Sequence, residues 1–379
     1  MPYITVAQSP AYHQITFEEI ISGAVNMNAM VTSNETNTRT YFSRNLRPAF
    51  LERFDFPAMI ETLENFNEQN SALFDVPRET LYTTFHVPKK SGGLREINAP
   101  VPELMNALRN LKTIFETKMF AKYHTAAFAY VPGRSTIDAI KRHQRNNSKW
   151  FLKTDFSNFF GSTTFEFLRY SLSLIFPFSE IVKSQRGRDA LDRALLLCFL
   201  HGGLPQGTPI SPMLTNLMMI PIDHKIYNSL RDFNGQSFVY TRYADDSLIS
   251  SRKDFSYDQI ISFINSTLAD FRAPFQIKDE KTRYGSRAGS NWNLGLMLNK
   301  DNEITIGYKN KQRFRAMINN YILDRQNGTV WDLHDVQVLR GLINYYRMVE
   351  EQYVDSVIRY NNEKYHTDVM RSIHEDLAA

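Results

Sequence analysis

Two adjacent carboxylates between two β-prone runs constrain the fold of this chain more than any other feature. The run SFVYTRY at 237–243 predicts a strand that ends at Tyr243, and SLISS at 247–251 predicts its antiparallel return. Asp245 and Asp246 then lie at the turn, where carboxylate oxygens are the ligands that Mg²⁺ prefers. An Asp pair also occurs at turns that are merely solvated, because Asp is a common turn former. The metal interpretation therefore depends on the rest of the chain.

Composition narrows the class of protein. The 379 residues are enough for more than one structural unit and a sizeable core. Cys198 is the only cysteine, which excludes disulfides within the chain and a cysteine-ligated zinc or iron–sulfur site. No apolar run reaches the roughly 18 residues that a membrane span needs, so we expect a cytoplasmic protein without a membrane partner. The net charge of +4 permits nucleic-acid binding without requiring it.

A second hairpin is predicted over residues 81–100, where two strand-like runs flank a Ser-Gly-Gly turn. Its tip and return strand carry Lys89, Lys90 and Arg95. Such a basic tip can bind phosphate groups or can simply be solvated. Further upstream, residues 25–40 are polar and rich in Asn and Thr, which indicates either an exposed connection or an ordered surface loop.

Hydrophobic periodicity predicts most of the remaining elements. Strands are expected at 150–155 and 274–278, and a further hairpin at 293–307. Helices are expected at 102–122, at 136–145, between 165 and 200, from Ser211 as N-cap to about Pro221, at 257–271, and through most of the last seventy residues.

A third acidic position, Asp155, ends the predicted buried strand in WFLKTDFSNFF at 150–160. If this strand lies beside the Asp245–Asp246 hairpin in one sheet, the three carboxylates converge. Two metal ions about 4 Å apart could then activate an attacking hydroxyl and stabilise a leaving pyrophosphate.

A stiff loop lies between these acidic segments, in HGGLPQGTPISPMLTN at 201–216. Gly207 would let the backbone approach a nucleotide or template closely, and Gln206 offers donor and acceptor atoms beside it. A plain Gly/Pro turn is the alternative reading of this loop.

Six ordered segments together resemble those of reverse transcriptases. LKTDFSNFF, LPQGTPISP and YADD resemble the palm motifs, KKSGGLREINAP the fingers hairpin, AYVPGRSTIDAI the segment before the first palm motif, and KDEKTRY the motif after the palm hairpin. The resemblance implies an α+β, right-hand polymerase fold whose palm is an antiparallel sheet packed on helices. The implied division is an N-terminal extension at 1–45, fingers at 46–148, a palm at 149–305 with a helical return at about 165–203, and a helical thumb at 306–379.

The resemblance also implies roles for the acidic positions. Asp155 and Asp245 would bind two Mg²⁺ ions, for which Mn²⁺ could substitute, with Asp246 as a third carboxylate. The backbone carbonyl of Phe156 would be an additional ligand. Lys281 would protonate the leaving pyrophosphate, although a surface salt bridge is the alternative for this lysine.

Nucleotide contacts follow from the same resemblance. Arg95 and Lys90, or its neighbour Lys89, would contact the incoming triphosphate, and Gln206 would lie beside the nucleotide. Phe160 occupies the position of an aromatic residue that packs under the sugar and leaves no room for a 2′-hydroxyl. An ordinary core role is the alternative for Phe160.

Contacts with nucleic acid are expected from Arg134, Gly207 and the basic thumb residues Lys311, Arg313 and Arg315. A solvated basic face is the alternative for the thumb. The implied function is an RNA-directed DNA polymerase of the retron-like or defence-associated bacterial type. Its partners would be a structured non-coding RNA template, deoxynucleoside triphosphates (dNTPs) and a cDNA product, with a protein effector or a homo-oligomer left open. An RNA-binding scaffold on a polymerase fold, and an RNA polymerase or untemplated nucleotidyl transferase, are the rival functions.

Overall fold

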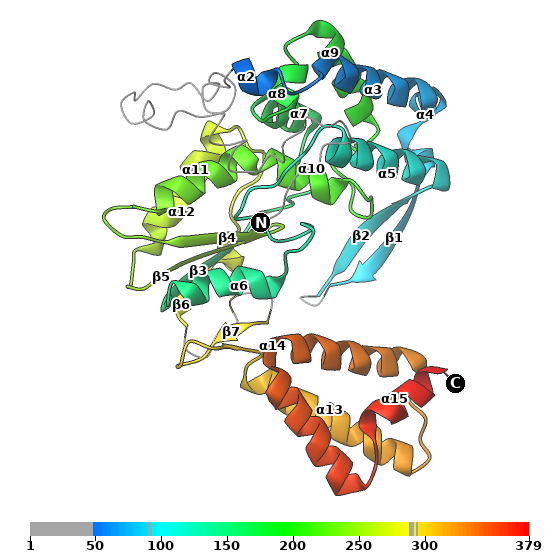
Figure 1. Ribbon diagram of the computed structural model, residues 1–379, viewed down its shortest axis with the longest axis vertical. Coiled ribbons are helices and arrows are strands. Elements are labelled where there is room, and N and C mark those ends of the chain that lie inside the picture. Colours follow the sequence, from blue (N-terminus) through cyan, green and yellow to red (C-terminus); the bar gives the residue numbers. More distant parts are fainter. Residues whose placement is uncertain (1–47, 90–91, 288–291, 293–294, 379) are drawn as a thin grey trace.

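The computed structural model describes residues 48–89, 92–287, 292 and 295–378. The predicted N-terminal extension at 1–45 and Lys90 lie outside the described residues. The described chain has the predicted α+β fold, with helices above a central sheet and a separate group of helices below it (Figure 1). These three parts correspond to fingers, palm and thumb, while the residue numbers at which we divide them stay a prediction.

A four-stranded antiparallel sheet forms the palm, in the order β4-β5-β3-β6. Its strands are β3 (Trp150–Asp155), β4 (Val239–Tyr243), β5 (Asp246–Ser251) and β6 (Arg283–Ser286). The hairpin predicted around the Asp pair and the strand that ends at Asp155 are therefore confirmed, and the two are neighbours.

One predicted strand is wrong. Residues 274–278 form only an isolated bridge between Phe156 and Ile277, and the fourth strand of the sheet begins later, at Arg283. Pro274 lacks a backbone N–H, which disfavours regular pairing at this point. The segment pairs briefly, antiparallel, with the residues at the end of β3 and leads into the short 3₁₀-helix η4 (Asp279–Lys281).

Side chains alternate between the two faces of the sheet, so both faces are covered. Leu152 and Ile249 belong to the large core that includes residues of α10 (Ser211–Met218), α11 (Ile220–Leu230) and α12 (Tyr257–Asp270). Phe151 and Leu248 point to the other face, where they join α6 (Thr136–Arg145) and thumb residues in a second core.

Helix termini follow the local sequence with one exception. Ser135 caps α6 and forms a capping box with Asp138, as an N-terminus of this type requires. Ser211 is the first residue of α10 and not its N-cap; the Thr208 hydroxyl accepts the Ser211 N–H instead. The helix ends at Met218, before Pro221, as predicted.

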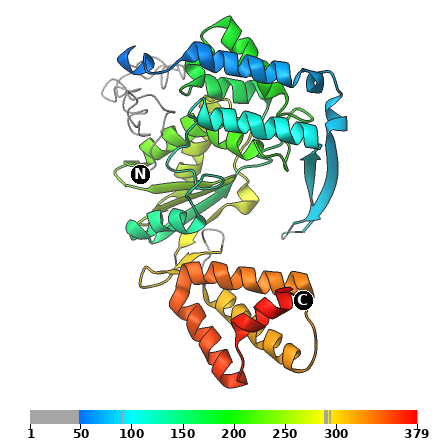
Figure 2. The same cartoon turned by 45° about the vertical axis from the view of Figure 1, so that its right-hand side comes forward.

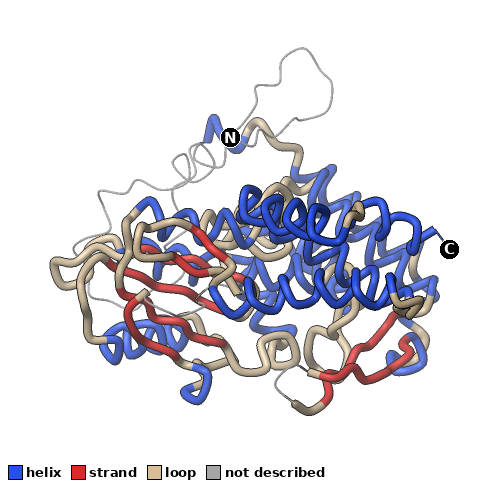
Figure 3. Tube along the Cα trace, turned by 90° about the horizontal axis from the view of Figure 1, so that it is seen from below, coloured by secondary structure: helices blue, strands red, loops and turns tan. Residues whose placement is uncertain are grey.

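The fingers consist of a hairpin and a cluster of helices. The hairpin predicted at 81–100 is confirmed as β1 (Tyr82–Pro88) and β2 (Leu94–Pro100), which follow the 3₁₀-helix η3 (Arg78–Leu81). Seen from below, this hairpin lies apart from the palm sheet (Figure 3). The helices of the fingers are α2 (Pro48–Leu51), α3 (Phe56–Gln69), α4 (Ser71–Phe74) and α5 (Pro102–Thr117). The helical return predicted at about 165–203 consists of α7 (Phe165–Ser173), α8 (Phe178–Ile181) and α9 (Gln185–Leu196), and α8 and α9 contact α3.

The thumb is helical, as predicted, and consists of α13 (Tyr308–Gln326), α14 (Leu333–Tyr365) and α15 (Val369–Ala378). The small hairpin of β7 (Met297–Leu298) and β8 (Ile304–Thr305) leads from the palm into α13. Helix α14 is kinked at Glu350, where φ and ψ are −140° and 70°. The β1–β2 hairpin points towards these helices (Figures 1 and 2). Over the described ranges, we find no helix whose length and apolar character would let it cross a membrane.

Candidate active site

The three carboxylates predicted from separate segments meet at one end of the palm sheet. Asp155 lies directly opposite Asp246 in the pairing of β3 with β5, which places the two side chains on the same face. The Phe156 N–H donates to the Asp245 carbonyl oxygen at 3.1 Å. The β4–β5 turn is therefore tied to the residue that follows Asp155.

Asp245 lies in an electrostatically unfavourable position. Burial, and then the neighbouring Asp155 carboxylate, raise the pKa of Asp245 above its ordinary value. Asp246 adds to the same effect. A site that gathers negative charge in this way is suited to bind cations, since a cation removes the repulsion.

Three lysines surround the carboxylates. Lys281 Nζ lies 3.0 Å from Asp155 Oδ2, and Lys278 Nζ lies 3.6 Å from Asp155 Oδ1. Lys153 Nζ lies 2.8 Å from Asp246 Oδ2. Although burial acts to lower it, the hydrogen bond to Asp155 raises the pKa of Lys281. Lys281 thus makes a salt bridge, as expected in the alternative interpretation, and its partner Asp155 is one of the three candidate carboxylates.

Sequence reasoning missed Lys153 and Lys278. Lys153 could have been found, because a residue two positions before Asp155 on a strand must share its face. Lys278 begins the KDEKTRY segment, but no local pattern indicated that this segment pairs with the end of β3 and so brings Lys278 near Asp155.

The donor chemistry of this site fits a hard divalent cation, because the side chains offer carboxylate oxygens. Among the described residues, no group of three or more acidic, His or Cys side chains is placed so that it could hold a metal ion by itself. Mg²⁺ commonly uses one or two carboxylates together with substrate phosphates. Asp155 and Asp245 are the two carboxylates to which that mode of binding would apply.

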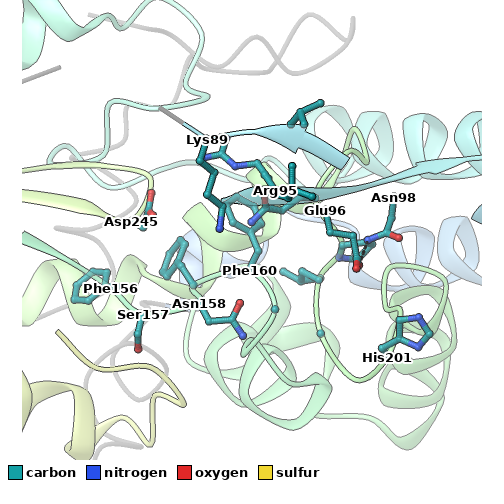
Figure 4. Close-up of a pocket in the computed structure, with 18 of the residues that line it drawn as sticks. Lys89, Arg95, Glu96, Asn98, Phe156, Ser157, Asn158, Phe160, His201 and Asp245 are labelled. Carbon is teal, nitrogen blue, oxygen red and sulfur yellow. Dashed lines mark hydrogen bonds between the residues drawn. The ribbon is translucent and has the colours of Figure 1, made fainter. Parts of the chain in front are cut away.

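A cavity of about 1130 Å³ opens beside the carboxylates. Figure 4 shows Lys89 and Arg95 coming from the fingers hairpin above Phe160, with Asp245 to one side. The cavity is large enough for a nucleotide, and it joins cationic, aromatic and acidic side chains from fingers and palm. Its lining includes Lys89, Arg95, Glu96, Asn98, Phe156, Asn158, Phe160, His201, Gln206, Asp245, Lys278 and Lys281.

Phe160 lies at the cavity wall and is only partly buried. Its ring packs edge-on against Phe159, with the centroids 5.8 Å apart. Both residues line the cavity, but Phe159 is buried at 3% exposure, whereas Phe160 is only partly buried. An exclusively core role for Phe160 does not fit this placement.

Gln206 and Gly207 join the palm loop to the fingers. The Gln206 carbonyl accepts the Asn98 N–H at 2.7 Å. Gly207 has a φ of +117°, and a Cβ there would lie 2.8 Å from the Asn98 carbonyl oxygen. The close approach predicted for Gly207 is therefore made to strand β2, and its contact with nucleic acid stays a prediction.

The other residues predicted to contact nucleic acid differ in whether their side chains are held by bonds within the protein. The Arg134 guanidinium donates to the carbonyls of His124 and Ala127, so it holds the loop before α6. Lys311 pairs with Glu350 at 2.5 Å and lies over the Tyr353 ring. On the same helix, Arg313 and Arg315 are exposed.

Carboxylates at the end of an antiparallel palm sheet, facing a basic hairpin across a cavity of nucleotide size, define a nucleic-acid polymerase. The profile of the family described as reverse transcriptase (RNA-dependent DNA polymerase) matches residues 87–312. The chain belongs to this family and is an RNA-directed DNA polymerase, with RNA as its template. Enzymes of this family use divalent metal ions.

Curated relatives refine the comparison. The chain is 26% identical over 303 residues to a retron Ec83 reverse transcriptase from Escherichia coli, covering 78% of this chain and 90% of the relative. It is 26% identical over 295 residues to a retron Mx65 reverse transcriptase from Myxococcus xanthus, covering 75% and 65%. A solved telomerase structure from Candida albicans, with a fragment of telomeric RNA, aligns at a TM-score of 0.42 with 14% identity, covering 83% of this chain and 64% of that one.

Proposed function

We propose that this chain copies a structured non-coding RNA into cDNA in the manner of the retron enzymes that it resembles. The observation that carries the proposal is the meeting of Asp155, Asp245 and Asp246 beside the cavity. This placement would bring the carboxylates to the reacting phosphate of a nucleotide held in the cavity.

Two Mg²⁺ ions, or Mn²⁺ in their place, would be held by Asp155, Asp245 and the Phe156 carbonyl. When bound, they would supply the charge that an in-line phosphoryl displacement develops. Asp246 is paired with Lys153, so its contribution would be to the charge of the site and to the position of the turn. The raised pKa of Asp245 fits a carboxylate that needs a cation beside it.

The cations around the cavity would bind the triphosphate. Lys89 and Arg95 line it from the fingers hairpin, and Lys90 is predicted to assist from the same tip. Lys281 lies within hydrogen-bond distance of Asp155, on the palm side. That position suits a proton donor to the leaving pyrophosphate.

Selection of the sugar would fall to Phe160. Its partly exposed ring lies in the cavity wall, where a 2′-hydroxyl on the incoming nucleotide would meet it. Gln206 lines the cavity and is held by Asn98, so it would place the nucleotide between palm and fingers.

The thumb would hold the template–product duplex. Arg313 and Arg315 are exposed on α13 and would contact phosphates. Arg134 and Lys311 are engaged in internal bonds, so they would act on nucleic acid mainly by fixing the segments that carry them. A cytoplasmic role in anti-phage defence, with a protein effector or a second copy of the chain as partner, accompanies the resemblance to retrons.

Primer extension tests this function. The wild-type protein, with Mg²⁺, dNTPs and a primer on RNA, should synthesise DNA, and Asp245→Asn should reduce the rate more than about 100-fold. Asp258→Asn removes an exposed carboxylate from the first turn of α12 and serves as the control with equal charge change.

The rival functions give different results in the same assay. An RNA-binding scaffold would incorporate nothing, an untemplated transferase would extend without RNA, and an RNA polymerase would prefer ribonucleotides. Equal activity of the wild type and Asp245→Asn would refute the proposed site. Sequencing the RNA and DNA that copurify with the protein would identify the template.

A further inference from the structure

A buried ion pair lies directly behind the β4–β5 turn. The Arg242 guanidinium donates from Nη2 to Asp223 Oδ2 at 2.8 Å and from Nε to Asp223 Oδ1 at 2.9 Å. Both side chains are 0% exposed. Asp223 belongs to the first turn of α11, so the pair links the catalytic hairpin to a helix that covers the sheet.

The guanidinium also bonds to the turn itself. Arg242 Nη1 donates to the Ala244 carbonyl oxygen at 2.9 Å. Tyr243 pairs with Asp246, so Ala244 and Asp245 are the two residues of the turn. The bonded carbonyl therefore belongs to the peptide unit that leads into Asp245.

The turn needs such support, because Ala244 has a φ of +56°. This left-handed conformation is unfavourable for a residue with a Cβ. The bond from the Arg242 side chain acts on the Ala244 carbonyl directly and so helps to hold the turn in this conformation.

Further bonds fix the guanidinium from several sides. Nη2 donates to Asn216 Oδ1 at 3.2 Å, and Asn216 in turn donates to the Ala129 carbonyl. The Tyr240 hydroxyl donates to Asp223 Oδ1 at 2.8 Å. The Arg242 backbone bonds to Ala126 and Phe128. The position of Arg242 is thus determined by α10, α11 and the loop before α6.

We infer that Arg242 is a positioning residue, which sets the place of the Asp245 carboxylate by fixing the Ala244 carbonyl, with Asp223 as its buried counter-ion. This inference rests on the proposed role of Asp245 in metal binding. The planar guanidinium bonds to the carboxylate along one edge and to the carbonyl along another in a fixed geometry, which the single ammonium of lysine does not reproduce. A buried ion pair often adds little to stability compared with apolar residues of similar volume, so a role in positioning accounts for its cost better than a role in stability.

Two variants separate positioning from folding. Arg242→Lys keeps a positive charge for Asp223 but has one nitrogen in place of the three that bond to Asp223 and to the Ala244 carbonyl. The double variant Arg242→Met/Asp223→Leu removes both charges together and leaves neither one buried alone. Arg169→Met/Asp192→Leu makes the same change of charge in an ion pair between α7 and α9, away from the turn, and is the control.

Thermal unfolding reports folding, and Mn²⁺ binding followed by electron paramagnetic resonance reports the carboxylates. At least one Arg242 variant should unfold cooperatively near the wild-type temperature, yet bind Mn²⁺ about 10–100-fold more weakly, as loss of a residue that orients a ligand does. Its Mg²⁺ midpoint in primer extension should rise while the KM for dNTPs changes little. The control should bind Mn²⁺ like the wild type.

The inference is overturned if a folded Arg242 variant binds Mn²⁺ and responds to Mg²⁺ like the wild type, or if neither variant folds. Failure of the proposed function has a different signature. In that case the wild type itself would neither bind Mn²⁺ nor synthesise DNA, and Asp245→Asn would change nothing.

Discussion

Lys153 and Asp246 form an ion pair at 2.8 Å on the face of the sheet that also carries Asp155. Both side chains are mostly buried, at 21% and 23% exposure. One of the three acidic residues therefore has a cation of its own within the protein, and the other two are left to share Lys278, Lys281 and any metal.

We expect Lys153→Met to destabilise the metal-free protein by about 1 kcal/mol, because Asp246 would lose its counter-charge beside Asp155. Mg²⁺ should then stabilise the variant more than the wild type, since it offsets the added repulsion. Thermal unfolding with and without Mg²⁺ measures both effects, and Lys153→Arg is the control that keeps the charge. An equal Mg²⁺ response in Lys153→Met and the wild type would contradict this expectation.

Asp245→Asn should raise the melting temperature of the metal-free protein at pH 7 while it removes activity. Burial and the Asp155 charge raise the pKa of Asp245, so ionisation of this group opposes folding. The neutral Asp245 carboxyl adds to the stability of the folded protein below the unfolded pKa of about 3.9, and this contribution is lost as the pH rises through the folded pKa. The advantage of the variant should therefore shrink as the pH falls towards about 4. Melting curves at several pH values would show this, and a variant that melts below the wild type at pH 7 would argue against it.

Phe160→Ala should increase the use of ribonucleotides relative to deoxynucleotides by about 10–100-fold, because the ring would no longer meet the 2′-hydroxyl. Single-nucleotide incorporation with matched dNTP and ribonucleotide pairs measures this ratio. Phe178→Leu alters a ring that is buried in the core and does not line the cavity, so it should lower stability without changing the ratio. If Phe160→Ala leaves this ratio unchanged, Phe160 does not select the sugar and serves only in packing.

Gly207→Ala should lower stability by about 1–3 kcal/mol, since its Cβ would meet the Asn98 carbonyl oxygen and its φ is +117°. Gly202→Ala is a matched control, because Gly202 also has a positive φ, of +78°, but no atom lies within 4 Å of its would-be Cβ. Denaturant unfolding measures the loss of stability in each variant: Gly202→Ala has only the backbone strain, and Gly207→Ala has the strain together with the steric clash against Asn98. Equal losses would mean that the contact with β2 contributes nothing.

Arg313→Ala and Arg315→Ala should each weaken duplex binding and reduce the magnitude of the slope of log K against log salt concentration by about 1, as expected for the loss of one phosphate contact. Arg325 on the same helix is paired with Asp376 and Glu375, so Arg325→Ala should leave the salt slope nearly unchanged. Fluorescence anisotropy over a range of salt concentrations would measure the slopes. A steeper loss for Arg325→Ala would place the nucleic acid on the other face of α13.

The two main hairpins, helix α6 and the positions of the three carboxylates at strand ends could be predicted from the amino-acid sequence alone. Each of these is encoded locally, by alternation of side chains, by turn residues such as those between β4 and β5, or by the capping pair Ser135 and Asp138. The order of the motifs then indicated which local elements belong to one palm.

Which charged groups lie together depends on the packing of distant segments. Lys278 lies near Asp155 because its segment pairs with the end of β3, and Gly207 packs on Asn98 because the palm loop contacts the fingers. Arg242 contacts Asp223 because α11 packs on the sheet. These contacts join residues far apart in the chain, and their geometry depends on how whole elements pack, which no local pattern encodes.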